Sequence, residues 1–140
     1  MAAGYSRSLF LLRGLFAVCR LDKKASVPDW AVSKHFFSVT RTDDELCVVC
    51  PQEGIPEGID CEPGWRCWKI ESPFEFDLSG AISSVAGLLA EADVLMFIIA
   101  TQDSDYLMIK EYDLERTISV VAQAGYQVDR EHQERRGHEL

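Results

Sequence analysis

Hydrophobic residues follow two different periods in the second half of the chain, and these periods predict its elements. Apolar side chains recur three and four positions apart over residues 81–92, the spacing of a helix with one buried face. The same pattern predicts a helix over residues 113–124, capped by Asp113, with Leu114, Ile118, Val121 and Ala122 inside and Gly125 as a left-handed C-cap. Runs that favour strands cover residues 65–70, 94–100 and 106–110. The run 94–100 is apolar nearly throughout, so it predicts a buried central strand.

The first half of the chain shows weaker patterns. They predict a short helix over residues 28–34, with Pro28 in its first turn. They also predict strands over residues 15–21, 36–40 and 46–50. Residues 51–63 are rich in Gly, Pro and acidic residues, so they mark the boundary between two modules.

The order of the elements predicts an α+β fold with antiparallel sheets and helices on one face. Hairpins around acidic turns occur in both halves, at residues 40–44 and 101–105, which is a weak internal repeat. We therefore expect a degenerate first module over residues 1–62, a second over 63–129, and a polar, disordered tail over 130–140.

The composition and net charge of the chain indicate which classes of partner to expect. The chain has 140 residues, 47% hydrophobic residues and a formal net charge of −9, which indicates a globular protein. Nucleic acid is not expected as a partner, because duplex binding needs clustered Lys and Arg, and a membrane is not expected either. The odd number of cysteines and the lack of a secretory signal favour a reducing, cytoplasmic location. Residues 1–21 contain three arginines and no acid, so a targeting segment of about 14 residues is the alternative.

The sequence contains no recognisable motif for metal binding or for catalysis. Cys47 and Cys50 have a spacing that suits zinc on a turn, but here they lie in a predicted strand, where positions three apart face opposite ways. No second cysteine pair follows at a zinc-ribbon spacing, and no nucleophile–base arrangement occurs. We expect no metal, no cofactor and no enzymatic activity.

Polar residues of the second module gather in two places, the segment Asp77-Leu78-Ser79-Gly80 and the turn that contains Thr101, Asp103 and Asp105. A helix N-terminus offers unpaired N–H groups that bind a carboxylate, and an aspartate can bind an ammonium group. Both places are expected at one edge of the sheet, with Asp105 at the surface. Together they could hold a free amino acid. The alternative is that Asp77 and Ser79 only cap the helix and Asp105 only stabilises a turn.

Several segments resemble short tandem ACT-domain proteins, which are similar to the ACT modules of aspartate kinases and of a cytosolic arginine sensor. In the first half these are Phe37-Ser38-Val39-Thr40, Glu45-Leu46, Val48-Val49-Cys50-Pro51 and Gly64-Trp65-Arg66. In the second half they are Lys69-Ile70 through Phe76, Leu78-Ser79-Gly80, Leu89-Ala90-Glu91-Ala92, Thr101, Asp105-Tyr106 and Asp113-Leu114-Glu115-Arg116.

The resemblance implies two ferredoxin-like βαββαβ (ACT) modules and a non-catalytic, regulatory module that binds an amino acid. It also implies a site shared between two copies, in which one supplies the glycine loop and Asp105 and the other a strand start at Leu95-Met96. A homodimer is expected, although the weaker first half could supply that second surface instead, and a regulated protein is a possible partner. Ala100 and Gln102 differ from the usual Ser and aromatic residue. They favour an alternative function, a protein-interaction module that has lost its ligand.

Overall fold

The computed structural model describes residues 8–33, 35–71 and 78–130, with the side chains of residues 78–82 outside the described part. Two compact units make up the chain. The helical unit comprises residues 1–13 and 66–140, and the β-unit comprises residues 14–65. The first 13 residues therefore belong with the second half of the chain, and the modules over residues 1–62 and 63–129 stay a prediction.

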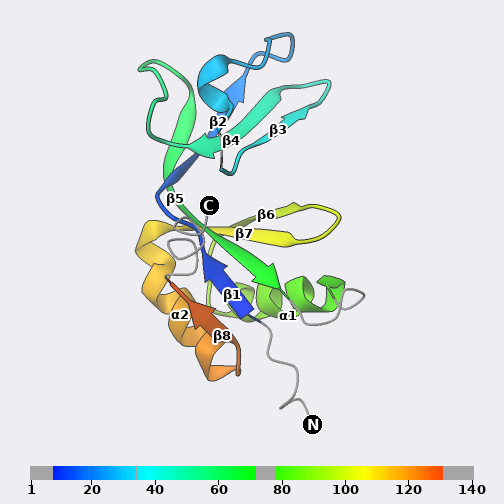
Figure 1. Ribbon diagram of the computed structural model, residues 1–140, viewed down its shortest axis with the longest axis vertical. Helices are drawn as coiled ribbons and strands as arrows, with labels where there is room; N and C mark the ends of the chain where they lie inside the picture. The colour runs from blue at the N-terminus through cyan, green and yellow to red at the C-terminus, as the bar shows by residue number, and fades with distance from the viewer. Residues whose placement is uncertain (1–7, 34, 72–77, 131–140) are drawn as a thin grey trace. The chain divides into compact units, whose positions relative to one another are not determined.

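The helical unit is a sheet with two helices (Figure 1). Neighbouring strands follow the order β6-β7-β5-β1-β8. The bounds are β1 Ser8–Leu11, β5 Cys61–Glu71, α1 Leu78–Glu91, β6 Met96–Ala100, β7 Asp105–Lys110, α2 Leu114–Gln123 and β8 Gln127–Asp129. One hydrophobic cluster joins Val85 and Leu89 of α1 and Val121 of α2 to Trp68 and Ile70 of β5. These elements form the α+β, ferredoxin-like arrangement that the sequence predicted.

Strand β1 was not predicted. It lies between β5 and β8, antiparallel to the first and parallel to the second. Leu9 and Leu11 of β1 are buried in the same core cluster as the helices. The segment is only four residues long and its partners are distant in sequence, so local periodicity could not identify it.

Strand β6 differs from its prediction as a buried central strand. Among the described strands it pairs only with β7, so it lies at an edge of the sheet. The side chain of Ile98 is 43% exposed, and that of Leu95, just before the strand, is 57% exposed. The prediction was wrong because a continuous apolar run indicates a tendency to be buried. It does not show which strands pair with that run.

Most of the residues predicted to form the inner face of α2 are buried or half-buried in the structure. Leu114 and Val121 are buried, but the exposed Ala122 is replaced in the core by Thr117. Asp113 occupies the N-cap position without a side-chain capping hydrogen bond. Gly125 has φ of 98°, in the left-handed region, as its C-cap position predicted.

The β-unit contains the strands β2 Phe16–Leu21, β3 Ser38–Arg41 and β4 Leu46–Pro51, and the first part of β5. Their order is β3-β4-β2-β5, with antiparallel pairing throughout. Within its described residues, its helical content is one 3₁₀ turn, η2 Asp29–Ala31, so the predicted helix over 28–34 is shorter than expected. The interpretation of this unit as a degenerate ACT module remains a prediction.

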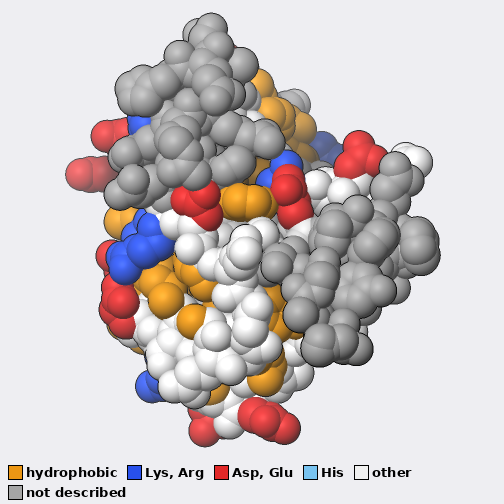
Figure 2. All heavy atoms as spheres, turned by 60° about the horizontal axis from the view of Figure 1, so that its bottom comes forward, with side chains coloured by type: hydrophobic (Ala, Val, Ile, Leu, Met, Phe, Trp, Pro, Cys, Tyr) orange, Lys and Arg blue, Asp and Glu red, His pale blue; other side chains and the backbone are white. Residues whose placement is uncertain are grey.

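Figure 2 shows one face of the molecule. Acidic side chains lie in several separate places on it, and hydrophobic side chains show between the polar ones. Within the described part of the chain, no helix has both the length and the apolar character needed to cross a bilayer.

Candidate functional site

The turn between β6 and β7 is held by its own polar groups. The Thr101 N–H and the Thr101 hydroxyl both donate to the Ser104 carbonyl, at 2.8 Å and 3.0 Å. The Ser104 N–H donates back to Thr101 Oγ1 at 3.1 Å. Thr101 and Asp103 are exposed, whereas Ser104 is buried. These bonds fix the backbone immediately before Asp105.

Asp105 begins β7 opposite Ala100 and is only 7% exposed. The sequence predicted a surface position, which is wrong. Burial raises the pKa of the Asp105 carboxyl above its usual value, because a charged carboxylate is poorly solvated there. Among the described residues, no ion pair or hydrogen bond engages this carboxylate. A carboxyl whose pKa is raised by burial is a candidate for binding a cationic group.

Helix α1 begins at Leu78 rather than at residue 81. Leu78, Ser79 and Gly80 therefore form its first turn, and their N–H groups are among those that lack a partner within the helix. Asp77 lies outside the described residues. Ser79 lies inside the helix, so the prediction that it caps the helix is not met. The start of α1 and the β6–β7 turn lie toward the same end of the helical unit's sheet (Figure 1).

Leu95 and Met96 lie at the other end of the β6–β7 hairpin. Met96 is opposite Ile109, whereas Ala100 is opposite Asp105. Four residues of strand separate the two ends by about 13 Å. One helical unit therefore does not bring Leu95 and Met96 to Asp105, and a site that uses all of them needs a second copy.

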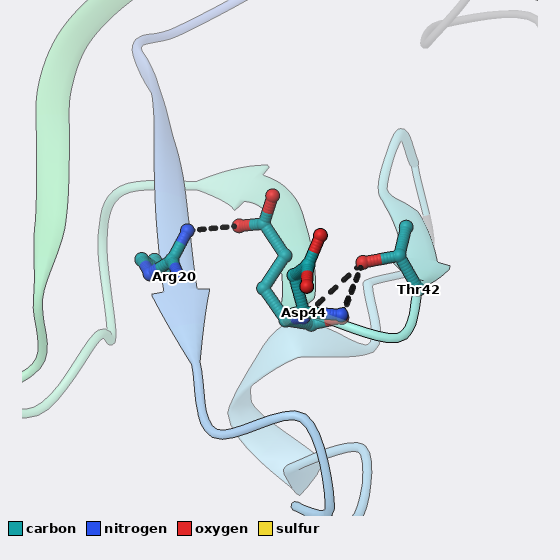
Figure 3. A network of polar contacts seen from close by, with 4 residues as sticks. Arg20, Thr42 and Asp44 are labelled. Atoms are coloured by element: carbon teal, nitrogen blue, oxygen red, sulfur yellow. Dashed lines mark hydrogen bonds and ion pairs between the residues drawn. The ribbon is translucent and has the colours of Figure 1, made fainter.

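A polar cavity of about 760 Å³ lies in the β-unit, at the ends of β2 and β4. Arg20 and Glu45 form an ion pair of 3.2 Å there, and Thr42 Oγ1 accepts from the N–H groups of Asp44 and Glu45 at 3.1 Å each (Figure 3). These contacts stabilise the turn between β3 and β4. The side chains that the structure describes contain no group of three His, Cys, Asp or Glu residues that could hold a metal ion.

The β-unit also contains cysteines whose arrangement the sequence did not reveal. Cys50 is buried and Cys47 is half-buried, which agrees with the prediction that they face opposite ways on one strand. Cys19 of β2 lies directly opposite Cys61 of β5. Sequence analysis missed this pair, because the pairing of β2 with β5 is not visible in local patterns.

Two family models match the chain. One describes an N-terminal domain and matches residues 14–58, and the other is the ACT domain and matches residues 60–123. The two matches follow the observed division of the chain near residue 65. No curated protein matches.

Solved structures of other proteins also resemble this chain. A protein from Agobacterium tumefaciens is 38% identical, with 91% of this chain and 95% of that chain covered and a TM-score of 0.85. A Vibrio cholerae protein of unknown function, described as a possible transport protein, is 17% identical over 84% of this chain and 89% of its own, with a TM-score of 0.69.

An aspartate kinase from Clostridium acetobutylicum, described as an allosteric enzyme, has a TM-score of 0.55. It is 9% identical, and the match covers 86% of this chain and 34% of the kinase. At this identity the likeness concerns the fold alone. The predicted resemblance to aspartate kinase ACT modules is confirmed, and the likeness to the arginine sensor stays a prediction. The family match and the fold agree that residues 60–123 of this chain are an ACT domain.

Proposed function

We propose that this protein is a non-catalytic regulatory module that responds to a free amino acid bound at its ACT domain. The observation that carries the proposal is Asp105, a largely buried aspartate with a raised pKa that forms no ion pair with a described residue. A ligand ammonium group would supply the missing charge, and its binding would lower the pKa of Asp105.

The other predicted residues fit this role. The first turn of α1, at Leu78, Ser79 and Gly80, offers N–H groups for the ligand carboxylate, and the helix dipole favours an anion there. Thr101 is already engaged with Ser104, so it orients the turn rather than contacting the ligand. Asp103 is exposed and would contribute negative charge at the edge of the proposed amino-acid site.

A homodimer is the second part of the proposal. Strand β6 leaves one edge without a partner among the described strands, and Leu95 and Ile98 are exposed beside it. Pairing with a second copy would cover this edge. The same contact would bring Leu95 and Met96 of the second copy toward Asp105. We place the protein in the cytoplasm, where its five free thiols would stay reduced in the absence of an added oxidant.

A thermal-shift screen against the standard amino acids tests the proposal. A ligand at 100 times its Kd should stabilise the folded protein by about 2.7 kcal/mol. Asp105→Asn should remove that shift, whereas Asp93→Asn, an exposed aspartate at the end of α1, should keep it. Gly80→Val should also weaken binding, because a side chain would obstruct the N–H groups of the first turn.

The alternative is an interaction module that keeps the ACT fold without a ligand. Ala100 and Gln102, which flank the exposed start of the turn, favour it because neither supplies a hydroxyl or an aromatic face. If no amino acid shifts the unfolding temperature of a folded dimer, this alternative replaces the sensor function.

A further inference from the structure

The β-unit brings three cysteine thiols together around Cys19. Cys19 on β2 is directly opposite Cys61 on β5, and Val48 of β4 is opposite Cys19 on the other side. Residues opposite one another in antiparallel strands face the same side of the sheet. Cys50, two residues beyond Val48, shares that face, and the Cys61 and Cys50 thiols both lie close enough to Cys19 to raise its pKa.

The backbone geometry at Cys19 and Cys61 suits a disulfide. Arg20 donates its N–H to the carbonyl of Asp60 at 2.9 Å, one residue beyond Cys19 and one before Cys61. Cys19 and Cys61 therefore form a non-hydrogen-bonded pair, in which the Cα atoms are about 4.5 Å apart. Disulfides span Cα distances of about 4.4–6.8 Å, so the two sulfurs can bond without a change of strand register.

The two thiols differ in their access to solvent. Cys61 is half-buried and lines a groove of about 320 Å³, whose walls include Ala17, Ile55 and Ile59. The loop that forms one wall of this groove contains Gly54 and Gly58, both with positive φ. Cys19 is buried, and burial together with the neighbouring thiols raises its pKa to about 12. A small oxidant therefore reaches Cys61 first.

We propose that Cys61 and Cys19 form a peroxide-sensitive thiol pair, which oxidises to a disulfide between β5 and β2. The Cys61 thiol loses its proton to solvent, and the thiolate sulfur attacks one oxygen of hydrogen peroxide. The O–O bond breaks, Cys61 sulfenic acid forms, and the leaving hydroxide takes up a proton to become one water. The Cys19 sulfur then attacks the Cys61 sulfur, the S–O bond breaks, and a second water leaves with the Cys19 proton. Two thiols are oxidised by two electrons, and one peroxide is reduced to two waters.

Cys50 also lies beside Cys19, but it takes no part in the proposed disulfide. It is buried and is not among the residues that line the groove. Burial raises the pKa of the Cys50 thiol, which disfavours the reactive thiolate. The disulfide therefore joins Cys19 to Cys61 rather than to Cys50.

Peptide mapping of the full chain after treatment with hydrogen peroxide tests the pair. Trypsin with a glutamyl endoproteinase releases Cys19 in residues 14–20, Cys61 in residues 58–66, and both Cys47 and Cys50 in residues 46–53. The expected product is residues 14–20 linked to residues 58–66, lighter by two hydrogen atoms and separated again by dithiothreitol.

Matched variants sharpen the test. Cys61→Ser should abolish the link, while Cys47→Ser, a half-buried cysteine on the other face of β4, should leave its yield within about twofold of the wild type. A link from residues 14–20 to residues 46–53 would overturn the proposal, as would over-oxidation of Cys61 without a link. Cys19→Ser places a hydroxyl in the core of the unit and is expected to destabilise it, so the mapping of the wild-type chain decides the outcome.

Discussion

At the scale of single residues, Asp105 couples the stability of the protein to pH. Its carboxyl has a raised pKa in the folded state, so the folded chain holds this proton more tightly than the unfolded chain. The free energy of unfolding should therefore fall as the pH rises from about 4 through the pKa of the folded state. Asp105→Asn should remove this fall and leave a variant at least as stable at pH 7. Urea unfolding at a series of pH values measures it, and a difference between variant and wild type that is constant with pH would contradict it.

Two glycines should respond oppositely to the same substitution. Gly125 has φ of 98°, so Gly125→Ala places a side chain in the left-handed region and should destabilise by about 1–2 kcal/mol. Gly87 lies inside α1 without positive φ, and an added Cβ would meet no atom within 4 Å. Gly87→Ala should therefore stabilise by about 0.5–1 kcal/mol. Denaturant midpoints of both variants test this, and equal signs would refute the assigned backbone conformations.

Residue patterns predicted the polar turn before Asp105 but not the burial of Asp105 itself. The spacing of apolar and polar residues located Asp105 beside a turn, and the structure confirms that turn. Burial of Asp105 was missed, because it depends on how β7 packs within the sheet and not on the residues adjacent to it. The position of Leu95 and Met96 at the far end of the hairpin likewise follows from strand register, which a single sequence does not display.

At the scale of elements, β6 is the edge on which the proposed dimer depends. Ile98 is 43% exposed on this strand, and Ile98→Lys adds a charge that opposes edge pairing. In light scattering at tens of micromolar, the wild type should be dimeric and the variant monomeric. Tyr112→Lys is the control, since Tyr112 is 78% exposed and lies outside the strand. A wild-type monomer, or an Ile98→Lys dimer, would exclude pairing through β6.

Elements with strong local patterns were predicted well, and those that depend on distant partners were not. Both helices of the helical unit and the β6–β7 hairpin follow from the periodicity of adjacent residues. The edge position of β6 and the existence of β1 depend on which strands pair across long stretches of sequence. The same reason explains why the Cys19–Cys61 pair was missed.

At the scale of the whole molecule, the ACT domain needs residues outside the segment that its family model matches. That match covers residues 60–123, yet β1 lies between β5 and β8 in the sheet. Leu9 is fully buried there, so Leu9→Ala should lower the free energy of unfolding by about 2–5 kcal/mol. Urea unfolding measures the loss. Ser8→Ala in the same strand is the control, and a similar small loss in both would show that β1 contributes little to this core.

The insertion of β1 also affects how the protein can fold during its synthesis. The ribosome releases Ser8–Leu11 early, but β5 follows only after the β-unit, and β8 lies at residues 127–129. All strands of the β-unit are available once residue 65 has emerged, so this unit can fold first. Until then Leu9 and Leu11 have no core to enter, and nascent β1 would expose apolar side chains that a ribosome-associated chaperone could bind.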